Sequence, residues 1–390
     1  MGRRVSVAVA TGLTVEVRRV VAAIFQACLG ALLLIWAGYP LLILVLARLL
    51  RRRPRPPLAT EKPALVSLII TSRERRADVQ ARVSDALALR KTDQRVEIIV
   101  ALDACGLASP DDFREDGRGI TYVRGDEPGG KACALNAGVR AATGDILVFA
   151  DTFQRFDPET IIRLSEALED KRFGAVSGAL HLPATGRAGG LLRIYWGMER
   201  SLRAAEARLH SSVGLTGAVC AVRRAGWTPL PAGLILDDLY IPMRLVLDGW
   251  RIGFEPRAVA LETRPPLPER EYLRKVRTLT GVLQLCAWLP GILSPRKNPI
   301  WVQFVGHKLI RFLTPFLLAG AMVSGLAVAE SRLGASRFIG MVAVVGLLLG
   351  LPGPPGAALR GAIRVGVMLQ WATLVALWNA SRGRWQVWSR

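Results

Sequence analysis

The sequence has few of the residues that form metal clusters and covalent cross-links. It contains five cysteines, without a Cys-x-x-Cys pair, and three scattered histidines. Disulfide-stabilised secreted domains and Cys/His zinc sites both depend on paired spacings of these residues. The sequence therefore argues against both classes, and we expect reduced thiols.

Acidic residues are also scarce. Asp and Glu number 31 against 52 Lys and Arg, which gives a formal net charge of +21, yet the mean hydropathy is +0.31. A protein that uses its charge on nucleic acid is normally polar and carries a recognition motif, and no such motif is found. The 51% hydrophobic content excludes a disordered chain. We therefore expect that the protein does not bind nucleic acid and that it associates with a lipid bilayer.

Charges are missing altogether from long apolar runs near both ends. Residues 20–47 are uncharged and are followed by several arginines, a pattern typical of a stop-transfer helix rather than a cleaved signal peptide. Pro40 is expected to kink this helix without ending it. Residues 312–329 predict a second span, and the broken run 338–381 predicts further membrane segments, taken as two, of which the first is short enough to be re-entrant.

The charge excess is concentrated beside these runs. Residues 1–60 carry a net +8 and residues 331–390 a net +7, which leaves +6 for 61–330. Because cytoplasmic flanks are rich in arginine, the central region is predicted to be cytoplasmic and the protein a multi-pass integral membrane protein of a bacterial-type plasma or inner membrane. The predicted order is an N-terminal segment (1–19), a span (20–47), a catalytic domain (64–264), interfacial helices (265–311), a span (312–329), further membrane segments (338–381) and a tail (382–390).

The central region alternates strand and helix signals. This pattern favours an α/β domain with βαβ units and a largely parallel sheet. Buried strands are predicted at 65–70, 96–102, 121–123 and 146–150, and helices at 77–89, 131–142, 158–168 and 191–209.

Acidic side chains follow the predicted strands. Asp103 and Asp151 each come directly after an apolar run, where ligands bind in open α/β sheets, although a turn or cap role explains either one alone. Lys131 follows two glycines at the start of a helix, which suits a phosphate. Asp237 and Asp238 open another helix, where they either serve its dipole or supply a general base.

Six segments together resemble membrane-bound family 2 glycosyltransferases of the GT-A fold, a family that includes the cellulose, chitin, hyaluronan and poly-N-acetylglucosamine synthases. The segments are VSLIITSRER, VEIIVALDAC, GKACALNAGV, GDILVFADTFQRFDPETI, TGAVCAVRR and LDDLYIPMRLVLDGWRIGFEP, all within residues 66–256. The resemblance implies a nucleotide-sugar-binding, Rossmann-like mixed sheet with one N-terminal and two to three C-terminal transmembrane helices.

The resemblance also implies roles for individual residues. It makes Asp238 the general base beside Asp237, and Asp151 the ligand of a divalent cation, Mg²⁺ or Mn²⁺, bound to the diphosphate of a uridine-based donor. It places Thr216 and Gly217 on the acceptor side. The residues assigned to donor binding are Thr71, Arg73, Asp103, Lys131, Asn136, Arg274 and Arg277.

Some positions depart from the family pattern. Phe153 stands where the family has the second acid of its Asp-x-Asp motif, so that Gln154 or Asp157 is a candidate helper for the metal. The segment 274–278 keeps the second basic position of the Gln-x-x-Arg-Trp motif without its Gln and Trp, so it is either a diphosphate site or a cationic membrane flank. Residues 281–293 are apolar but too short to span, and predict an interfacial segment with Trp288 at headgroup level.

The predicted function is transfer of a hexose or N-acetylhexosamine, with inversion, from a nucleotide sugar to a growing glycan at the membrane. The expected partners are the donor, a glycan or lipid-linked acceptor, the bilayer and membrane partner subunits. A narrower alternative is a single transfer to a polyprenyl-phosphate or lipid carrier, which the incomplete Gln-x-x-Arg-Trp motif favours. A third is a catalytically silent assembly subunit, which only Phe153 supports.

Overall fold

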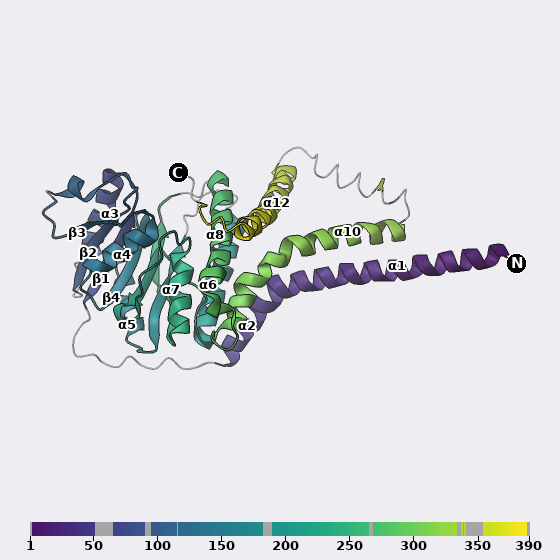
Figure 1. Ribbon diagram of the computed structural model, residues 1–390, viewed down its shortest axis with the longest axis horizontal. Helices are drawn as coiled ribbons and strands as arrows, with labels where there is room; N and C mark the ends of the chain where they lie inside the picture. The colour runs from purple at the N-terminus through teal and green to yellow at the C-terminus, as the bar shows by residue number, and fades with distance from the viewer. Residues whose placement is uncertain are drawn as a thin grey trace.

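The computed structural model describes residues 2–50, 65–89, 95–114, 116–181, 189–264, 268–333, 337, 339–340 and 354–387. The arginine run at 51–55 and nearly all of the apolar run 338–351 lie outside these ranges. Within them, an α/β domain is joined to long helices that project away from it (Figure 1).

One mixed sheet of eight strands forms the centre of the domain. Its order is β3-β2-β1-β4-β7-β6-β8-β5, with β3, β2, β1 and β4 parallel to one another and β7 antiparallel to both of its neighbours. The four predicted strands are present, and the antiparallel half is added by later segments. The strands are β1 (Val66–Ser72), β2 (Val96–Leu102), β3 (Thr121–Arg124), β4 (Ile146–Asp151), β5 (Gln154–Phe156), β6 (Phe173–His181), β7 (Val219–Arg223) and β8 (Arg251–Glu262).

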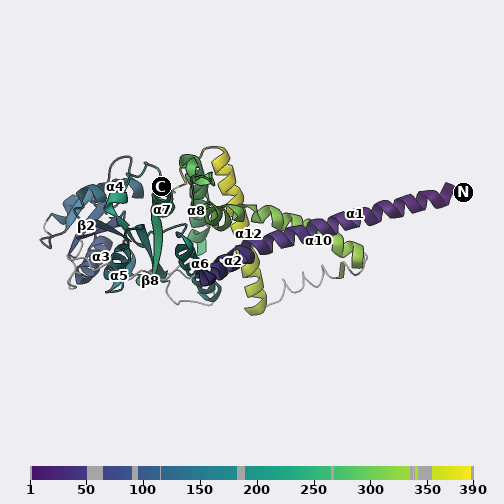
Figure 2. The ribbon, with the colours of Figure 1, turned by 90° about the horizontal axis from the view of Figure 1, so that it is seen from below.

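Both faces of the sheet are covered, which is why its central strands are buried along most of their length and mostly apolar. In β1, Ile69 belongs to one core cluster while Leu68 and Ile70 belong to another on the opposite face. Helices α4 (Lys131–Ala141) and α7 (Asp237–Leu247) contribute to the first cluster, and α3 (Arg76–Ala88) and α5 (Thr160–Leu168) to the second. Figure 2 shows helices on both sides of the strands.

The N-terminal apolar run is helical throughout the described residues. α1 (Gly2–Leu33) passes through a π-helical turn (Leu34–Gly38) into α2 (Tyr39–Leu49). The π turn lies directly before Pro40, whose missing N–H and ring prevent a regular α-helical bond there. The proline therefore changes the winding of the helix without ending it, as the sequence predicts.

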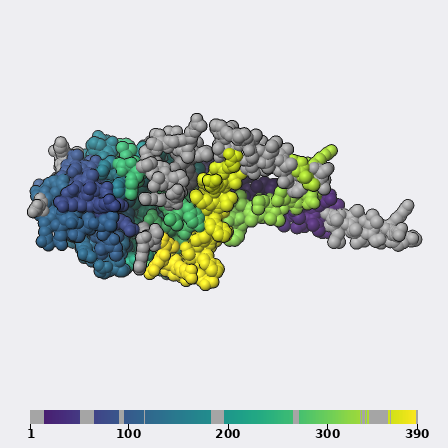
Figure 3. Space-filling model, turned by 90° about the horizontal axis from the view of Figure 1, so that it is seen from above, coloured from purple at the N-terminus to yellow at the C-terminus, as the bar shows by residue number. Residues whose placement is uncertain are grey.

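The C-terminal helices begin earlier than the sequence predicts. α9 (Trp301–Phe304), a π turn (Val305–Leu309), a 3₁₀ turn (Ile310–Leu313) and α10 (Thr314–Leu333) follow without a break, so the apolar helix contains His307, Lys308 and Arg311. α10 packs along α1, and α12 (Pro354–Ser381) packs on α8 (Pro268–Trp288) and α10. The space-filling view shows the helix pair extending as a stalk (Figure 3).

Two helices of the described chain are long and apolar enough to cross a membrane. They run over Val15–Leu49 and Trp301–Ser331. Their large apolar side chains are widely exposed, as at Leu34 (68%) and Val323 (67%). The rest of the described chain does not cover these side chains, so the two helices present a large exposed apolar surface.

The predicted interfacial segment is folded onto the α/β domain. α8 contains most of it, and Val282 and Leu285 join the same core cluster as α4 and α7. A short 3₁₀ turn (Pro290–Leu293) follows, while Trp288 keeps 36% of its surface exposed. Its apolar face is thus used by protein packing, a contact that sequence periodicity does not distinguish from contact with lipid.

Candidate active site

The parallel strands bring Thr71 and Asp151 together. β1 pairs with β4 so that these two residues are direct neighbours at the carboxyl ends of their strands, and Thr71 Oγ1 lies 3.4 Å from Asp151 Oδ1. The carboxyl ends of neighbouring parallel strands meet at one edge of a sheet. A predicted donor-binding residue, Thr71, and the predicted metal ligand, Asp151, are therefore adjacent.

Lys131 joins the acids of two separate segments. Its Nζ lies 3.0 Å from Asp151 Oδ1 at the end of β4 and 3.2 Å from Asp237 Oδ2 at the start of α7. Burial alone would favour the neutral amine, but the charges of Asp151 and Asp237 outweigh it and raise the pKa of Lys131. The ammonium therefore stays charged at the centre of the site.

The α4 helix is able to start at Lys131 because two glycines precede it. Gly129 and Gly130 have φ angles of +88° and +92°, a region that other residues rarely adopt. The main-chain N–H of Gly130 donates to Asp103 Oδ1 (2.8 Å), as does that of Cys105 (3.0 Å). One oxygen of Asp103 thus holds this loop, at the same edge of the sheet as Asp151. This is the turn role predicted from the sequence as an alternative for Asp103.

Asp238 has the electrostatic surroundings of a base. Its burial and the neighbouring charge of Asp237 raise its pKa above the usual value, while Lys131, Arg203 and Lys308 pull it down. A carboxylate with a raised pKa accepts a proton more readily near neutral pH. The second acid of the pair is therefore suited to general-base chemistry.

The acceptor-side segment lies against this acid. A Cβ added to Gly217 would lie 3.2 Å from Asp238 Cβ and 3.6 Å from Lys131 Nζ. The N–H of Leu215 donates to the main-chain oxygen of Asp238 at 2.8 Å. The segment that contains Thr216 and Gly217 therefore lies beside Asp238, and its acceptor role stays a prediction.

Arg274 and Arg277, the two residues of α8 assigned to donor binding, lie in different surroundings. Burial lowers the pKa of Arg277, while the negative charges of Asp238, Asp237 and Asp151 partly raise it, so these acids are within electrostatic reach of its guanidinium. Arg274 is exposed and pairs with Glu271 at 2.6 Å. Of the two residues, Arg277 is the one that the structure brings to the site.

Two further residues assigned to donor binding, Asn136 and Arg73, contact the main chain of neighbouring loops. The Asn136 side-chain amide donates to the Leu230 carbonyl and accepts from the Leu230 N–H, each at 2.8 Å. These two hydrogen bonds fix the loop before α7. Arg73 is exposed on the loop after β1, where its carbonyl accepts from Leu107. The structure thus gives Asn136 a role in holding this loop, and its donor contact stays a prediction.

A divalent metal at this edge would find one acid at the end of β4. Phe153 occupies the place of the second acid, and Arg264 lies over its ring at 3.4 Å. Gln154 donates to Glu262, and Asp157 Oδ1 accepts from Glu159, so neither candidate helper turns to Asp151. Among the described residues no three His, Cys, Asp or Glu side chains form a metal-holding group. One carboxylate fits a hard cation whose other ligands are phosphate and water oxygens.

Sequence reasoning missed the residues that support these acids. Arg82 is fully buried on α3, with Nε 3.3 Å from the Asp151 carbonyl and one guanidinium nitrogen 2.6 Å from Asp85. It shares a helix face with Val79, Val83 and Ala86, and a charge on an otherwise apolar face is the signal that could have found it. Arg203 on α6 (Gly189–Leu209) was missed in the same way.

Comparisons with known proteins identify the family of the chain. The model of the family described as glycosyltransferase-like family 2 matches residues 63–281. An N-acetylglucosaminyltransferase from Azorhizobium caulinodans is 27% identical in an alignment of 180 residues that covers 42% of this chain and 45% of that protein. The chain thus matches less than half of the length of this relative.

Among solved structures, a mannosyltransferase from Pyrobaculum calidifontis in complex with GDP-Man and Mn²⁺ has a TM-score of 0.69 and 19% identity. The match covers 92% of this chain and 98% of that one. A glucosyl-3-phosphoglycerate synthase from Mycobacterium tuberculosis, with Mn²⁺ and uridine-diphosphate-glucose, has a TM-score of 0.40 and 20% identity over 57% of this chain and 79% of that one.

Proposed function

Because the chain belongs to glycosyltransferase-like family 2 and has that family's mixed α/β sheet, we propose that it transfers a sugar, with inversion, from a nucleotide sugar to an acceptor hydroxyl at the membrane. The acceptor is a growing glycan for surface or extracellular use. The observation that carries the proposal is the arrangement of four charged residues. Asp238, whose pKa is raised, lies beside Lys131, which forms ion pairs with both Asp151 and Asp237.

In the proposed mechanism, Asp238 takes the proton of the acceptor hydroxyl, whose oxygen forms the new bond to the anomeric carbon. The bond from that carbon to the donor diphosphate breaks on the opposite side, and its electron pair leaves with the diphosphate. Lys131 and Arg277 bring positive charge to this region, where negative charge develops. Mg²⁺ or Mn²⁺, when bound through Asp151, would neutralise part of the diphosphate charge.

The donor is proposed to be a UDP-sugar, and the name of the bacterial relative makes UDP-N-acetylglucosamine the first candidate. The test is release of nucleoside diphosphate by the full chain in detergent with Mn²⁺ or Mg²⁺, from UDP-N-acetylglucosamine, UDP-glucose and GDP-mannose. If none of these donors is turned over, the proposal fails. A ladder of radiolabelled products indicates glycan extension, whereas a single lipid-extractable product indicates one transfer to a lipid carrier.

Asp238→Asn is expected to abolish this turnover while nucleoside diphosphate binding survives, since the amide cannot accept the proton. Asp248→Asn is the matched control, because Asp248 lies at the other end of α7 and pairs on the surface with Arg244 at 3.1 Å. Turnover and thermal shift with UDP are measured on both variants. Unchanged turnover in Asp238→Asn would remove this residue from its role.

A further inference from the structure

A buried group of charges lies where the long helices meet the catalytic domain. We call it the junction cluster. It consists of Tyr39, Glu199, Arg203, Glu206, His307, Lys308 and Arg311. Its members come from α2, α6 and the helical segment 301–313, which are far apart in the sequence. None of them takes part in the proposed chemistry.

His307 is at the centre of the junction cluster and is fully buried. Its Nδ1 lies 2.8 Å from Glu206 Oε1, and its Nε2 lies 2.8 Å from Glu199 Oε1. Tyr39 donates to the same oxygen of Glu206 at 2.6 Å. The two ring nitrogens of His307 therefore connect both acids of α6 to the helical segment 301–313.

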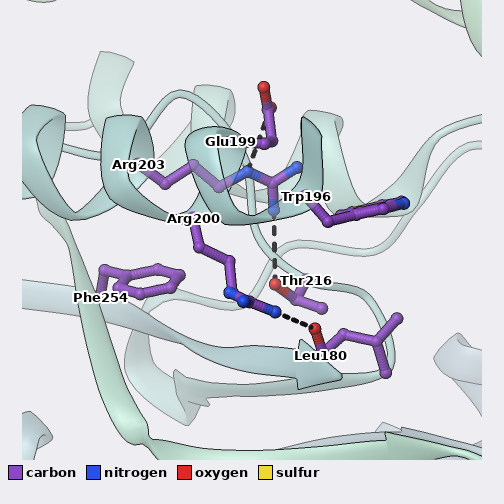
Figure 4. Close-up of a pocket in the computed structure, with 7 residues that line it drawn as sticks. All are labelled: Leu180, Trp196, Glu199, Arg200, Arg203, Thr216 and Phe254. Atoms are coloured by element: carbon purple, nitrogen blue, oxygen red, sulfur yellow. Dashed lines mark hydrogen bonds and ion pairs between the residues drawn. The ribbon is translucent and has the colours of Figure 1, made fainter. Parts of the chain in front are cut away.

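Arg203 carries this connection toward the active site. Its Nε lies 3.4 Å from Glu199 Oε1, and one of its terminal nitrogens lies 3.3 Å from Thr216 Oγ1 and 3.4 Å from the Leu215 carbonyl. Figure 4 shows the guanidinium between Glu199 and Thr216, at the wall of a small pocket that Trp196 and Phe254 also line.

The segment that Arg203 holds is bonded to the proposed base. Leu215 donates to the Asp238 carbonyl at 2.8 Å, and Gly217 lies against the Asp238 side chain. Thr216 is also held by β6, since its N–H donates to Ser177 Oγ at 2.8 Å and its hydroxyl donates to the Gly178 carbonyl at 2.9 Å. Every link from His307 to Asp238 is thus a direct contact.

We propose that Arg203 is a positioning residue that fixes the 215–217 segment, and through it Asp238, to the junction cluster and so to the membrane-proximal helices. This role rests on the proposed function, because it concerns the geometry of the proposed base. It also gives a reason for burying so many charges together. A buried ion pair adds little stability after desolvation, but it specifies one arrangement of the groups that it joins.

The charge of Arg203 gives the role a distinctive readout. Asp238 is faced by Asp237 on its own helix, Lys131 on α4, Arg277 on α8, Arg203 on α6 and Lys308 from the stalk. Arg203 is one of the cations that lower the pKa of Asp238, so its loss moves the acid limb of the turnover–pH profile to higher pH. A purely structural defect would lower turnover without moving that limb.

The experiment measures UDP release from UDP-N-acetylglucosamine by the full-length variants, across pH, with UDP binding and thermal unfolding as folding checks. Arg203→Met is expected to lower kcat by roughly ten- to hundred-fold with the donor KM unchanged, because a displaced base loses its alignment. Its acid limb moves to higher pH. Arg203→Lys keeps the positive charge but loses the planar guanidinium. The acid limb of its pH profile is therefore expected to stay in place while part of the turnover is lost.

Arg200→Met is the matched control, because Arg200 lines the same pocket but donates to the Leu180 carbonyl (3.2 Å). It is expected to leave turnover and pH profile unchanged. Glu199→Gln, nearly the same shape, tests the link if Arg203→Met does not fold, and is expected to lower kcat in the same way.

The outcomes separate the two proposals. An active wild type with an inactive Asp238→Asn variant, but with wild-type kcat and acid limb in Arg203→Met, overturns the positioning role alone. Equal losses in Arg203→Met and Arg200→Met, with an unmoved limb, overturn it too. A wild type that turns over no donor overturns the proposed function and the positioning role together.

Discussion

At the scale of single residues, Lys131 is the charge that organises the site. It bridges Asp151 on the sheet and Asp237 on α7, two acids that are 86 positions apart in the sequence. Without a cation between them, these carboxylates would repel each other in a partly buried space. Asp238 lies just beyond this bridge, and its burial together with Asp237 raises its pKa.

The raised pKa of Asp238 predicts an acid limit to activity. A base works only when it is deprotonated, so turnover falls as the pH is lowered through its pKa, which lies above the ordinary aspartate value of about 4. The measurement is UDP release as a function of pH, with circular dichroism at each pH to separate titration from unfolding. Turnover that persists down to about pH 4 in a folded protein would contradict this assignment.

At the scale of elements, the fit of α4 on the sheet fixes where Lys131 points. The helix crosses β1 and β2 closely at Gly138, where an added Cβ would lie 2.7 Å from Ile69 Cγ2 and 3.2 Å from Ala101 Cβ. A close approach of helix to sheet requires a residue without a side chain at the contact. Helix propensity alone would favour alanine, so packing decides this position.

Gly138→Ala is therefore expected to destabilise the domain by about 1–3 kcal/mol, because the new methyl forces α4 away from β1. Gly197→Ala is the control, since Gly197 is also within a helix and has no atom within 4 Å of its added Cβ. Thermal unfolding in detergent measures both variants. The expected order is a lower Tm for Gly138→Ala and an unchanged or higher Tm for Gly197→Ala; equal values would contradict the packing explanation.

At the scale of the whole molecule, an enzyme domain stands on a stalk of apolar helices (Figure 1). α1 and α10 lie against each other but leave most of their outward side chains uncovered. The stalk meets the domain at the junction cluster, so the domain is joined to it by buried charges as well as by the chain itself.

We predict that the full chain is an integral membrane protein. Apolar helices of this length and exposure favour the bilayer core. The expected result is a chain that stays in the membrane fraction after alkaline carbonate washing and is released by detergent. A cytosolic enzyme and a known membrane transporter are the controls in the same fractionation. Release by carbonate alone would contradict the prediction.

Sequence and structure contribute differently to the candidate site. Strand periodicity and the acids after β2 and β4 predict the donor edge of the sheet, because the chain direction of parallel strands is enough to bring their ends together. Asn136 and Arg274 could not be assigned in this way. Their partners, the Leu230 main chain and Glu271, depend on which way each side chain turns.

The sequence by itself determined the α/β class, the parallel half of the sheet, the glycine-led start of α4 and the apolar runs at both ends. These features follow from local patterns that repeat with the period of a strand or a helix. Only the tertiary structure decided that Lys131 joins Asp151 to Asp237, that α8 packs on the domain, and that His307 and Arg203 connect the stalk to Asp238. Those contacts join segments distant in the chain, and long-range packing leaves no periodic signal in the sequence.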